Sequence, residues 1–230
     1  MTDLLARLRT IEGVELHPTL GALGPNSVLA DLPSAHRGLL AATNGCEAYG
    51  GYLRLWGTMR EGGPDLNSWN EPNHWKFAWK GAADDYLCFA ESGWGDQYAY
   101  RRVPGGTIEE VVYFGDAITL QWEPIAQTFE DFFREEFERV AANPYDSATV
   151  RAREKFPLLP VDKHVVYVPS LLLGAREEEA EIGILGARTA MILNGDVFAQ
   201  TRDLPEGAVI SRVESYQDAD GRPRVRVRHT

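Results

Sequence analysis

The sequence predicts an α+β protein in which an antiparallel sheet carries helices on one face and a small, mostly β extension follows. Short apolar runs separated by glycine turns fill the middle of the chain, a pattern typical of hairpin-connected strands. Apolar residues at helical spacing stand before and after these runs. Beyond the Asn-Pro at 143–144 the pattern changes to β-branched runs and hairpin turns. We therefore divide the chain into residues 1–143 and 144–230.

The first 80 residues predict mainly helices. Leucines and an isoleucine recur at helical spacing over residues 3–11. The Leu-Pro-Ser at 32–34 begins a second helix with proline in its first turn, and the Asn-Gly at 44–45 ends it. A strand bounded by glycines follows over residues 51–57. Residues 67–80 predict one or two short helices, rich in aromatic residues and interrupted by a proline.

The centre of the chain predicts a β-hairpin with an aromatic tip. An apolar run leads into a Glu-Ser-Gly turn, and residues 97–102 then alternate polar side chains with tyrosines. Gly93 and Gly95 flank Trp94, so a large aromatic stands where the backbone has most freedom. The acids Glu91 and Asp96 stand on either side. Trp94 is therefore the first candidate for an exposed recognition side chain, with a packed core aromatic as the alternative.

Two further strands and a long helix complete the first part. The strands are predicted at 110–114 and 118–122, joined through a Gly-Asp turn. Thr128, with Asp131 three residues later, resembles a capping box and begins an amphipathic helix rich in phenylalanine. The run of strands between helices is what favours an α+β arrangement with helices on one face.

The extension predicts a helix over 146–155 and then mostly strands. Short β-branched runs occupy 164–168 and 182–185. The Asn-Gly at 194–195 predicts a hairpin between strands 189–193 and 197–201, and the Asp-Gly turn at 218–221 predicts a second hairpin.

In the last predicted strand, four arginines alternate with other residues and share one face of the hairpin. They are Arg222, Arg224, Arg226 and Arg228. A solvated face that protects an edge strand by charge is the favoured interpretation. Pairing with the acidic first part of the chain, or with an acidic partner, is the alternative.

The charge distribution favours a basic partner. The formal net charge is −11, from 34 acids against 23 Lys and Arg residues. Through Asn143 there are 21 acids and 11 basic residues; from Pro144 there are 13 and 12. Such acidity argues against nucleic-acid binding, which depends on clustered Lys and Arg. It suits a partner with a basic surface, whose approach the field would accelerate. Solubility alone is the alternative explanation.

Composition places the chain among ordinary globular proteins, without a predicted membrane segment. Apolar residues make up 44% of the chain, and no apolar run approaches the roughly 20 residues that span a bilayer. The N-terminal residues lack the pattern of a signal peptide, so we expect a cytoplasmic protein. The only cysteines, Cys46 and Cys88, predict no disulfide framework.

No catalytic or metal-binding motif is recognisable. The five histidines are scattered without metal-ligand spacing, and no phosphate-binding loop or nucleophile elbow is present. We therefore expect no enzyme activity, no cofactor and no metal. Asp84 and Asp85 are adjacent acids, but neighbours along an extended chain point to opposite faces. Trp69, in a polar setting, is the second candidate for an exposed aromatic after Trp94.

Three stretches in series resemble the SMI1/KNR4 family of the SUKH superfamily. The first is the Leu-Pro-Ser helix that ends at the Asn-Gly of 44–45. The second is the Phe-Ala-Glu-Ser-Gly-Trp-Gly-Asp-Gln-Tyr hairpin over 89–98. The third runs from the Val-Tyr-Phe strand at 112–114 to the Thr-Phe-Glu-Asp-Phe-Phe helix at 128–133. Their order and spacing fit the family over roughly residues 25–140, and the sequence after Pro144 lies outside it.

The resemblance implies an α+β domain without enzymatic activity. Many bacterial members look like immunity proteins that bind and neutralise a cognate toxin, often a nuclease, and fungal members act as regulatory interaction proteins. An immunity protein facing a basic toxin is the favoured interpretation, and a regulatory or scaffold module with another protein partner is the alternative. The expected contact residues are Asp84, Asp85, Glu91, Trp94, Asp96 and Trp69. A small-molecule-binding or hydrolytic protein that uses the aromatic loops and Asp84, Asp85 or Glu91 is the third, least favoured interpretation.

Overall fold

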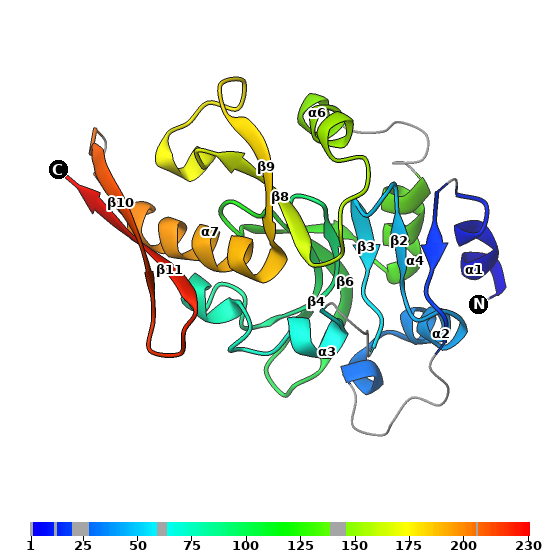
Figure 1. Ribbon diagram of the computed structural model, residues 1–230. Helices are drawn as coiled ribbons and strands as arrows, with labels where there is room; N and C mark the ends of the chain where they lie inside the picture. The colour runs from blue at the N-terminus through cyan, green and yellow to red at the C-terminus, as the bar shows by residue number, and fades with distance from the viewer. Residues whose placement is uncertain (1, 12, 20–27, 59–63, 139–145, 206) are drawn as a thin grey trace.

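A seven-stranded antiparallel sheet forms the centre of the structure, and its strands follow one another in chain order (Figure 1). The computed structural model describes residues 2–11, 13–19, 28–58, 64–138, 146–205 and 207–230. The strands are β1 (Glu15–Leu16), β2 (Cys46–Ala48), β3 (Leu53–Leu55), β4 (Tyr86–Ser92), β5 (Gln97–Arg102), β6 (Ile108–Gly115) and β7 (Trp122–Ala126). Each strand pairs antiparallel with the next. The predicted α+β class is confirmed.

The helices of the first part begin and end largely where the sequence predicts. They are α1 (Thr2–Leu8), η1 (Val28–Asp31), α2 (Ser34–Ala42), α3 (Leu66–Trp69), η2 (Lys76–Trp79) and α4 (Phe129–Phe132), which continues as the π-helix η3 (Phe133–Glu138). The side chain of Thr128 accepts a hydrogen bond from the backbone N–H of Asp131, which confirms the predicted cap. Figure 1 shows α1, α2 and α4 together at the N-terminal end of the molecule.

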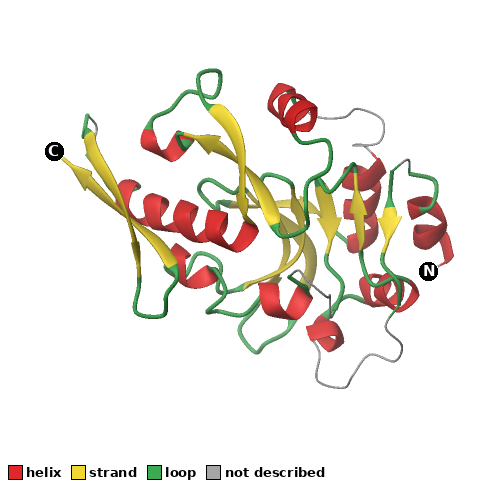
Figure 2. Cartoon of the chain, viewed as in Figure 1, coloured by secondary structure: helices red, strands yellow, loops and turns green. Residues whose placement is uncertain are grey.

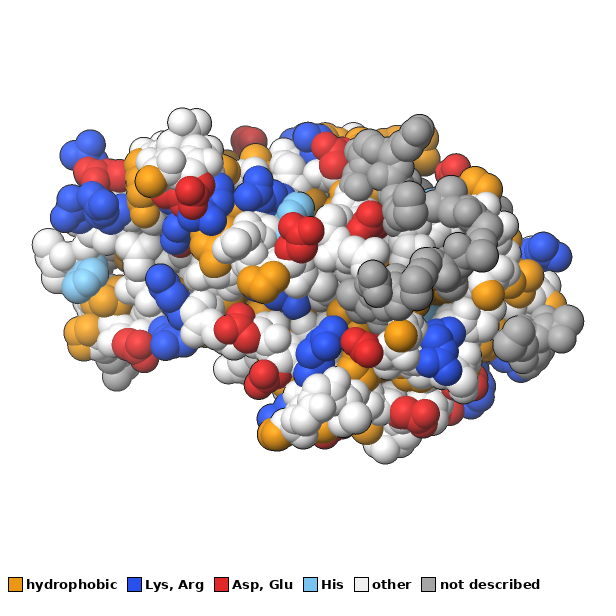
Figure 3. Space-filling model, turned by 90° about the horizontal axis from the view of Figure 1, so that it is seen from below, with side chains coloured by type: hydrophobic (Ala, Val, Ile, Leu, Met, Phe, Trp, Pro, Cys, Tyr) orange, Lys and Arg blue, Asp and Glu red, His pale blue; other side chains and the backbone are white. Residues whose placement is uncertain are grey.

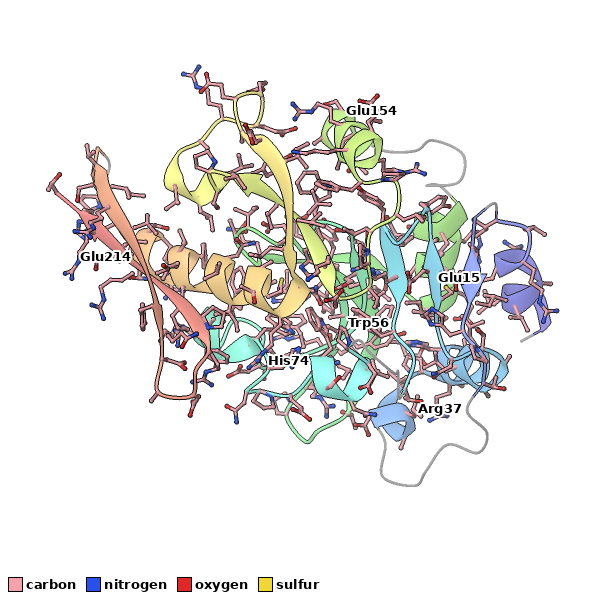
Figure 4. All side chains as sticks on the ribbon, viewed as in Figure 1. Glu15, Arg37, Trp56, His74, Glu154 and Glu214 are labelled. Atoms are coloured by element: carbon pink, nitrogen blue, oxygen red, sulfur yellow. The ribbon has the colours of Figure 1, made fainter. Side chains whose placement is uncertain are left out.

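Aromatic side chains fill the space between α2, α4 and the sheet. Phe89 of β4 stacks on Tyr100 of β5, with ring centres 4.4 Å apart, and Phe132 meets Phe89 edge-on. His36 lies inside this cluster, stacked on Phe129 at 4.2 Å. Burial lowers the pKa of His36 to about 3, so its imidazole is neutral and packs as an aromatic ring. Further toward the middle, four tryptophans are fully buried: Trp56 (labelled in Figure 4), Trp69, Trp75 and Trp79.

The extension consists of two hairpins joined by a long helix (Figure 2). Its elements are α6 (Ser147–Lys155), β8 (Lys163–Val168), η4 (Leu171–Leu173), β9 (Glu181–Gly186), α7 (Ala187–Thr201), β10 (Ile210–Gln217) and β11 (Pro223–His229). β8 pairs with β9 and β10 pairs with β11, both antiparallel. α7 contacts both hairpins and also η2 of the first part. Its carbonyl at Met191 accepts a hydrogen bond from the indole of Trp79 at 3.0 Å.

Two predictions about secondary structure are wrong. The Asn-Gly at 194–195 does not turn a hairpin but lies inside α7, where Gly195 is buried. The reason is a close contact: a Cβ atom at Gly195 would stand 2.9 Å from the indole of Trp79. The strand predicted at 118–122 is instead a turn in which Asp116 accepts hydrogen bonds from the N–H groups of Ile118 and Thr119. The strand itself follows as β7. The short strands β1 and β2 were not predicted.

Gly195→Ala is expected to destabilise the protein, although alanine favours helices by about 1 kcal/mol over glycine. The added Cβ would stand 2.9 Å from the Trp79 ring and 3.0 Å from a backbone carbon of Ala78. Overpacking of this kind costs about 1–3 kcal/mol, so we expect a net loss of about 1 kcal/mol of unfolding free energy. Urea denaturation would measure it. A more stable variant would show that helix propensity outweighs the contact.

Candidate functional site

The tip of the β4–β5 hairpin is a braced turn. The hydroxyl of Ser92 donates a hydrogen bond to Asp96 at 2.6 Å, and the other carboxylate oxygen of Asp96 accepts from the N–H of Ala117 at 2.9 Å. Gly95 has a φ of +90°, which favours glycine, and a Cβ there would meet the ring of His164 at 2.6 Å. The glycines therefore let the tip approach the extension closely.

Trp94 packs on the extension and is half-buried. Its ring stacks on Tyr167 of β8 with 4.6 Å between ring centres. Its indole N–H donates to the hydroxyl of Thr149 in α6 at 2.9 Å. Of the two interpretations of Trp94, packing therefore describes most of its contacts, although part of its surface remains accessible.

A pocket of about 390 Å³ opens beside Trp94, between the first part of the chain and the extension. Its aromatic lining is Trp94 and Tyr167, and its acids are Asp96, Asp146 and Glu177. Aliphatic residues and polar side chains complete the wall: Ala117, Ile118, Ser147, Ala148, Val165, Val166, Ser170, Leu171 and Asn194. Two of the expected contact residues, Trp94 and Asp96, therefore meet at one pocket.

Two of the three acids of the pocket are held by local hydrogen bonds. Burial raises the pKa of Asp96, and the Ser92 and Ala117 hydrogen bonds oppose that rise. Asp146 caps α6 by accepting from the N–H of Thr149 at 2.7 Å. Glu177 lies 3.8 Å from Arg151, a solvent-exposed and weak pair. Three carboxyl groups against one nearby guanidinium give the pocket an acidic character.

The pocket's chemistry suits a cation. Carboxylate oxygens accept from ammonium or guanidinium groups, and aromatic rings contact the apolar stem of a Lys or Arg side chain. Its lining residues include no histidine, lysine or cysteine. Within the described ranges, no three His, Cys, Asp or Glu residues are grouped as metal ligands would be.

Behind the hairpin, a buried charged cluster joins the first part of the chain to the extension. Arg54 of β3 forms a 2.8 Å ion pair with Glu91 of β4, and Nε2 of His164 in β8 lies 3.0 Å from the same carboxylate. All three side chains have at most 1% of their surface exposed. The Arg54 guanidinium also donates to the carbonyls of Pro160 and Lys163 at 2.9 and 3.1 Å. The cluster thus fixes the segment that precedes β8 against the sheet.

Hydrogen bonds satisfy the rest of the Glu91 carboxylate. Gln97 donates to it at 3.3 Å, and the indole N–H of Trp69 donates to Gln97 at 2.7 Å. Burial opposes ionisation of Glu91, but His164 and Arg54 outweigh it and lower the pKa of this carboxyl. Glu91 is therefore ionised at neutral pH.

The structure separates the six expected contact residues into three groups. Trp94 and Asp96 line the pocket. Trp69 and Glu91 are fully buried, so neither has surface to offer a partner, and their predicted place on a contact surface is wrong. Asp84 and Asp85 are exposed but precede β4, whereas the tip follows it. The seven residues of β4 separate the two ends by roughly 23 Å.

Sequence reasoning missed the residues that the extension contributes. Tyr167, Asp146 and Glu177 approach the hairpin tip only in three dimensions, and nothing in their local sequence marks them. Arg54 did carry a signal, because it stands alone as a charge inside the apolar strand Leu-Arg-Leu. A charge in such a strand requires a buried partner.

An acidic α+β domain, with an antiparallel meander and an aromatic hairpin tip, is the class that these features define. The model of the SMI1 / KNR4 family (SUKH-1) matches residues 28–135, so this part of the chain is similar to a domain of that family. The matched range includes Trp94 and Asp96, whereas Asp146, Tyr167 and Glu177 lie beyond it. No curated protein matches the sequence closely enough to count as a relative.

Proposed function

We propose that the protein is a non-enzymatic immunity-type module that binds and neutralises a cognate toxin with a basic surface, acting in the cytoplasm. The similarity of residues 28–135 to the SMI1/KNR4 family supports a protein-interaction role. The net charge of −11 supports a basic partner, because opposite fields accelerate encounter. No helix in the described part of the chain is long and apolar enough to cross a membrane.

The acid-lined pocket beside Trp94 is the observation that carries the proposal. It combines Asp96, Asp146 and Glu177 with the rings of Trp94 and Tyr167 in about 390 Å³. A lysine or arginine side chain of the partner fits this combination, since its stem contacts the rings and its charged end meets the carboxylates. Asp96 and Asp146 are held by hydrogen bonds before the partner arrives, so little ordering of these two acids is needed on binding.

The test uses the protein encoded next to this chain in its genome. If that neighbour is a toxin, co-expression of the full chain should restore growth, and the purified pair should bind with an affinity that falls as salt rises. The expected contact acids Asp84 and Asp85 provide a direct comparison. If Asp84→Asn with Asp85→Asn abolishes binding and the pocket variants do not, the partner docks at the other end of β4.

Asp146→Asn combined with Glu177→Gln is expected to weaken binding about tenfold to a hundredfold, equivalent to roughly 1.4–2.8 kcal/mol. Both changes remove charge and keep size, and asparagine still caps α6. Titration calorimetry measures the dissociation constant. Glu178→Gln with Glu179→Gln is the matched control, because these exposed acids lie outside the pocket lining. Equal weakening by both pairs would show that only overall charge matters.

Binding without rescue has a different meaning. A chain that binds its neighbour-encoded protein through the pocket but leaves its toxicity unchanged would be a regulatory or scaffold module of the same family. A chain that neither binds nor rescues would contradict the immunity role.

A further inference from the structure

The β10–β11 hairpin projects from the end of the molecule opposite the N-terminal helices (Figure 1). Its two strands pair only with each other in the part of the chain that the structure describes. Glu214, labelled in Figure 4, lies on β10. Figure 3 shows basic and acidic side chains side by side at this end. A two-stranded sheet has two outer edges, and among the described residues of this hairpin the edge of β11 is covered by side chains while the edge of β10 is not.

The outer edge of β11 is covered by side chains of α7. Asp196 accepts from the N–H of Val225 at 3.1 Å, and Gln200 accepts from the N–H of Val227 at 3.0 Å. Gln200 also donates to the carbonyl of Val225 at 3.0 Å. Arg224 holds Asp196 in place with two hydrogen bonds, at 2.7 and 2.5 Å. This edge has no room for another strand.

Among the described residues, no strand pairs with the outer edge of β10. At the turn, the backbone N–H of Asp218 donates to the carbonyl of Arg222. Hydrogen-bonded pairs alternate along an antiparallel ladder, so the backbone N–H groups of Tyr216, Glu214 and Arg212 also point toward β11. The N–H groups of Val213, Ser215 and Gln217 therefore point away from β11. Exposed apolar side chains gather on the same stretch: Val209 is 61%, Val213 39% and Tyr216 40% exposed.

The central sheet does not leave such an edge. Its first strand, β1, has only two residues. Its last strand, β7, exposes Glu123 and Pro124, and proline cannot donate to a ladder. By comparison, β10 has eight residues and no proline. A long open edge with apolar side chains is the surface that pairs with another strand.

We propose that β10 pairs antiparallel with β10 of a second copy, forming a twofold-symmetric dimer with a four-stranded sheet. The charges of the strand favour a register centred on Val213. Centred on Val213, the pairing places Arg212 opposite Glu214 of the second copy, twice by symmetry, and brings the two Val213 side chains together. Centring on Arg212 or Glu214 would oppose like charges. In the register centred on Val213 the strand is therefore complementary to itself in charge.

The expected dimer is weak and depends on concentration. A register shift between Ile210 and Arg212 interrupts the strand, so the new ladder is short. A short ladder buries little area, which is typical of transient association. Sedimentation velocity on the full chain from about 1 to 200 µM should show a reversible monomer–dimer equilibrium, with a dissociation constant in the micromolar range.

Two opposite charge reversals test the register. R212E gives a strand with two acids and E214R gives one with two arginines, so each variant alone should lose at least about tenfold in dimer affinity. Mixed together, they restore both opposite-charge contacts, and we expect heterodimers. Recovery in the mixture would show that the single variants fail because of the interface and not because the hairpin is damaged. Mixing does not restore the Arg212–Glu214 ion pair within either copy. E178R, an exposed acid outside β10, is the matched control.

The backbone edge is tested separately. Ser215→Pro removes an outward N–H and should abolish dimerisation, whereas Ser215→Ala should not; circular dichroism checks folding. A wild-type chain that stays monomeric over the whole range overturns the proposal. A dimer that survives both Ser215→Pro and the charge reversals overturns it too, and so does a mixture of R212E and E214R that fails to associate. Toxin binding is a separate measurement, so its failure leaves these outcomes distinct.

Discussion

Glu91→Ala is expected to lower the free energy of unfolding by about 3–5 kcal/mol, because it leaves buried charge without a partner. Arg54 would keep its carbonyl partners but lose the carboxylate that neutralises it at 2.8 Å. His164 would lose the acceptor at Nε2, and its Nδ1 is already without a hydrogen-bond partner within the described ranges. A loss of this size is a large fraction of the stability of a typical domain.

Urea denaturation followed by tryptophan fluorescence measures the effect, and Glu136→Ala on the partly buried surface of η3 is the comparison. Replacing the whole group, as Arg54→Met, Glu91→Leu and His164→Phe together, should cost much less than the single change. Apolar replacement of a complete buried pair is often neutral. If Glu91→Ala costs less than about 1 kcal/mol, water reaches the cluster and the account of it is wrong.

The same carboxyl makes stability depend on acid pH. Its pKa is lower in the folded state than the ordinary value of about 4.3 for an unfolded glutamate. Its contribution is therefore fully present above that ordinary value and is lost as pH falls through the folded-state pKa. Glu91→Gln, which cannot titrate, should show a shallower fall of stability below about pH 4 than the wild type. An unchanged pH profile would mean that other carboxyl groups dominate the acid transition.

Local sequence signals predicted the elements whose folding is decided locally. The cap at Thr128, the proline at the start of α2 and the glycines of the β4–β5 hairpin act within a few residues, and all three are found as expected. The Asn-Gly at 194–195 failed because its outcome depends on Trp79, more than a hundred residues away. Burial of α7 against η2 outweighs the turn preference.

The site was harder to predict because it joins distant parts of the chain. Composition around Trp94 marked the hairpin tip, but its partners Tyr167 and Thr149 carry no local mark. Glu91 was expected on the surface because it adjoins a turn. In the structure, Glu91 of β4 lies opposite Arg54 of β3, and the side chain of Glu91 points inward to form the ion pair with Arg54. An alternating pattern shows which side a residue faces only when the buried side is known.

Among the described residues, arginines of the last strand pair with acids of the extension rather than with the acidic first part of the chain. Arg222 and Arg224 pair with Asp218, and both guanidiniums lie over the ring of Phe77, at 4.1 and 5.1 Å from its centre. Arg226 and Arg228 remain exposed. The pair of Arg224 with Asp196 of α7 and the contacts with Phe77 attach one end of the hairpin to the body, while the two arginines at the other end stay exposed.

Trp94→Ala is expected to cost about 3 kcal/mol of unfolding free energy and also to weaken partner binding. The ring stacks on Tyr167 and holds α6 through Thr149, so its removal opens a cavity between the hairpin tip and the extension. It also removes one aromatic wall of the pocket. Thermal unfolding measures the first effect, and titration with the partner at a temperature where the variant is folded measures the second.

Trp94→Phe separates the two roles. Phenylalanine keeps a ring against Tyr167 but cannot donate to Thr149, so we expect a smaller loss of about 1 kcal/mol. If partner binding requires an aromatic ring at position 94, the Phe variant binds nearly as well as the wild type and the Ala variant does not. If the Ala variant keeps full affinity while its stability falls, Trp94 only supports the extension. The partner would then be recognised by the acids of the pocket without the ring.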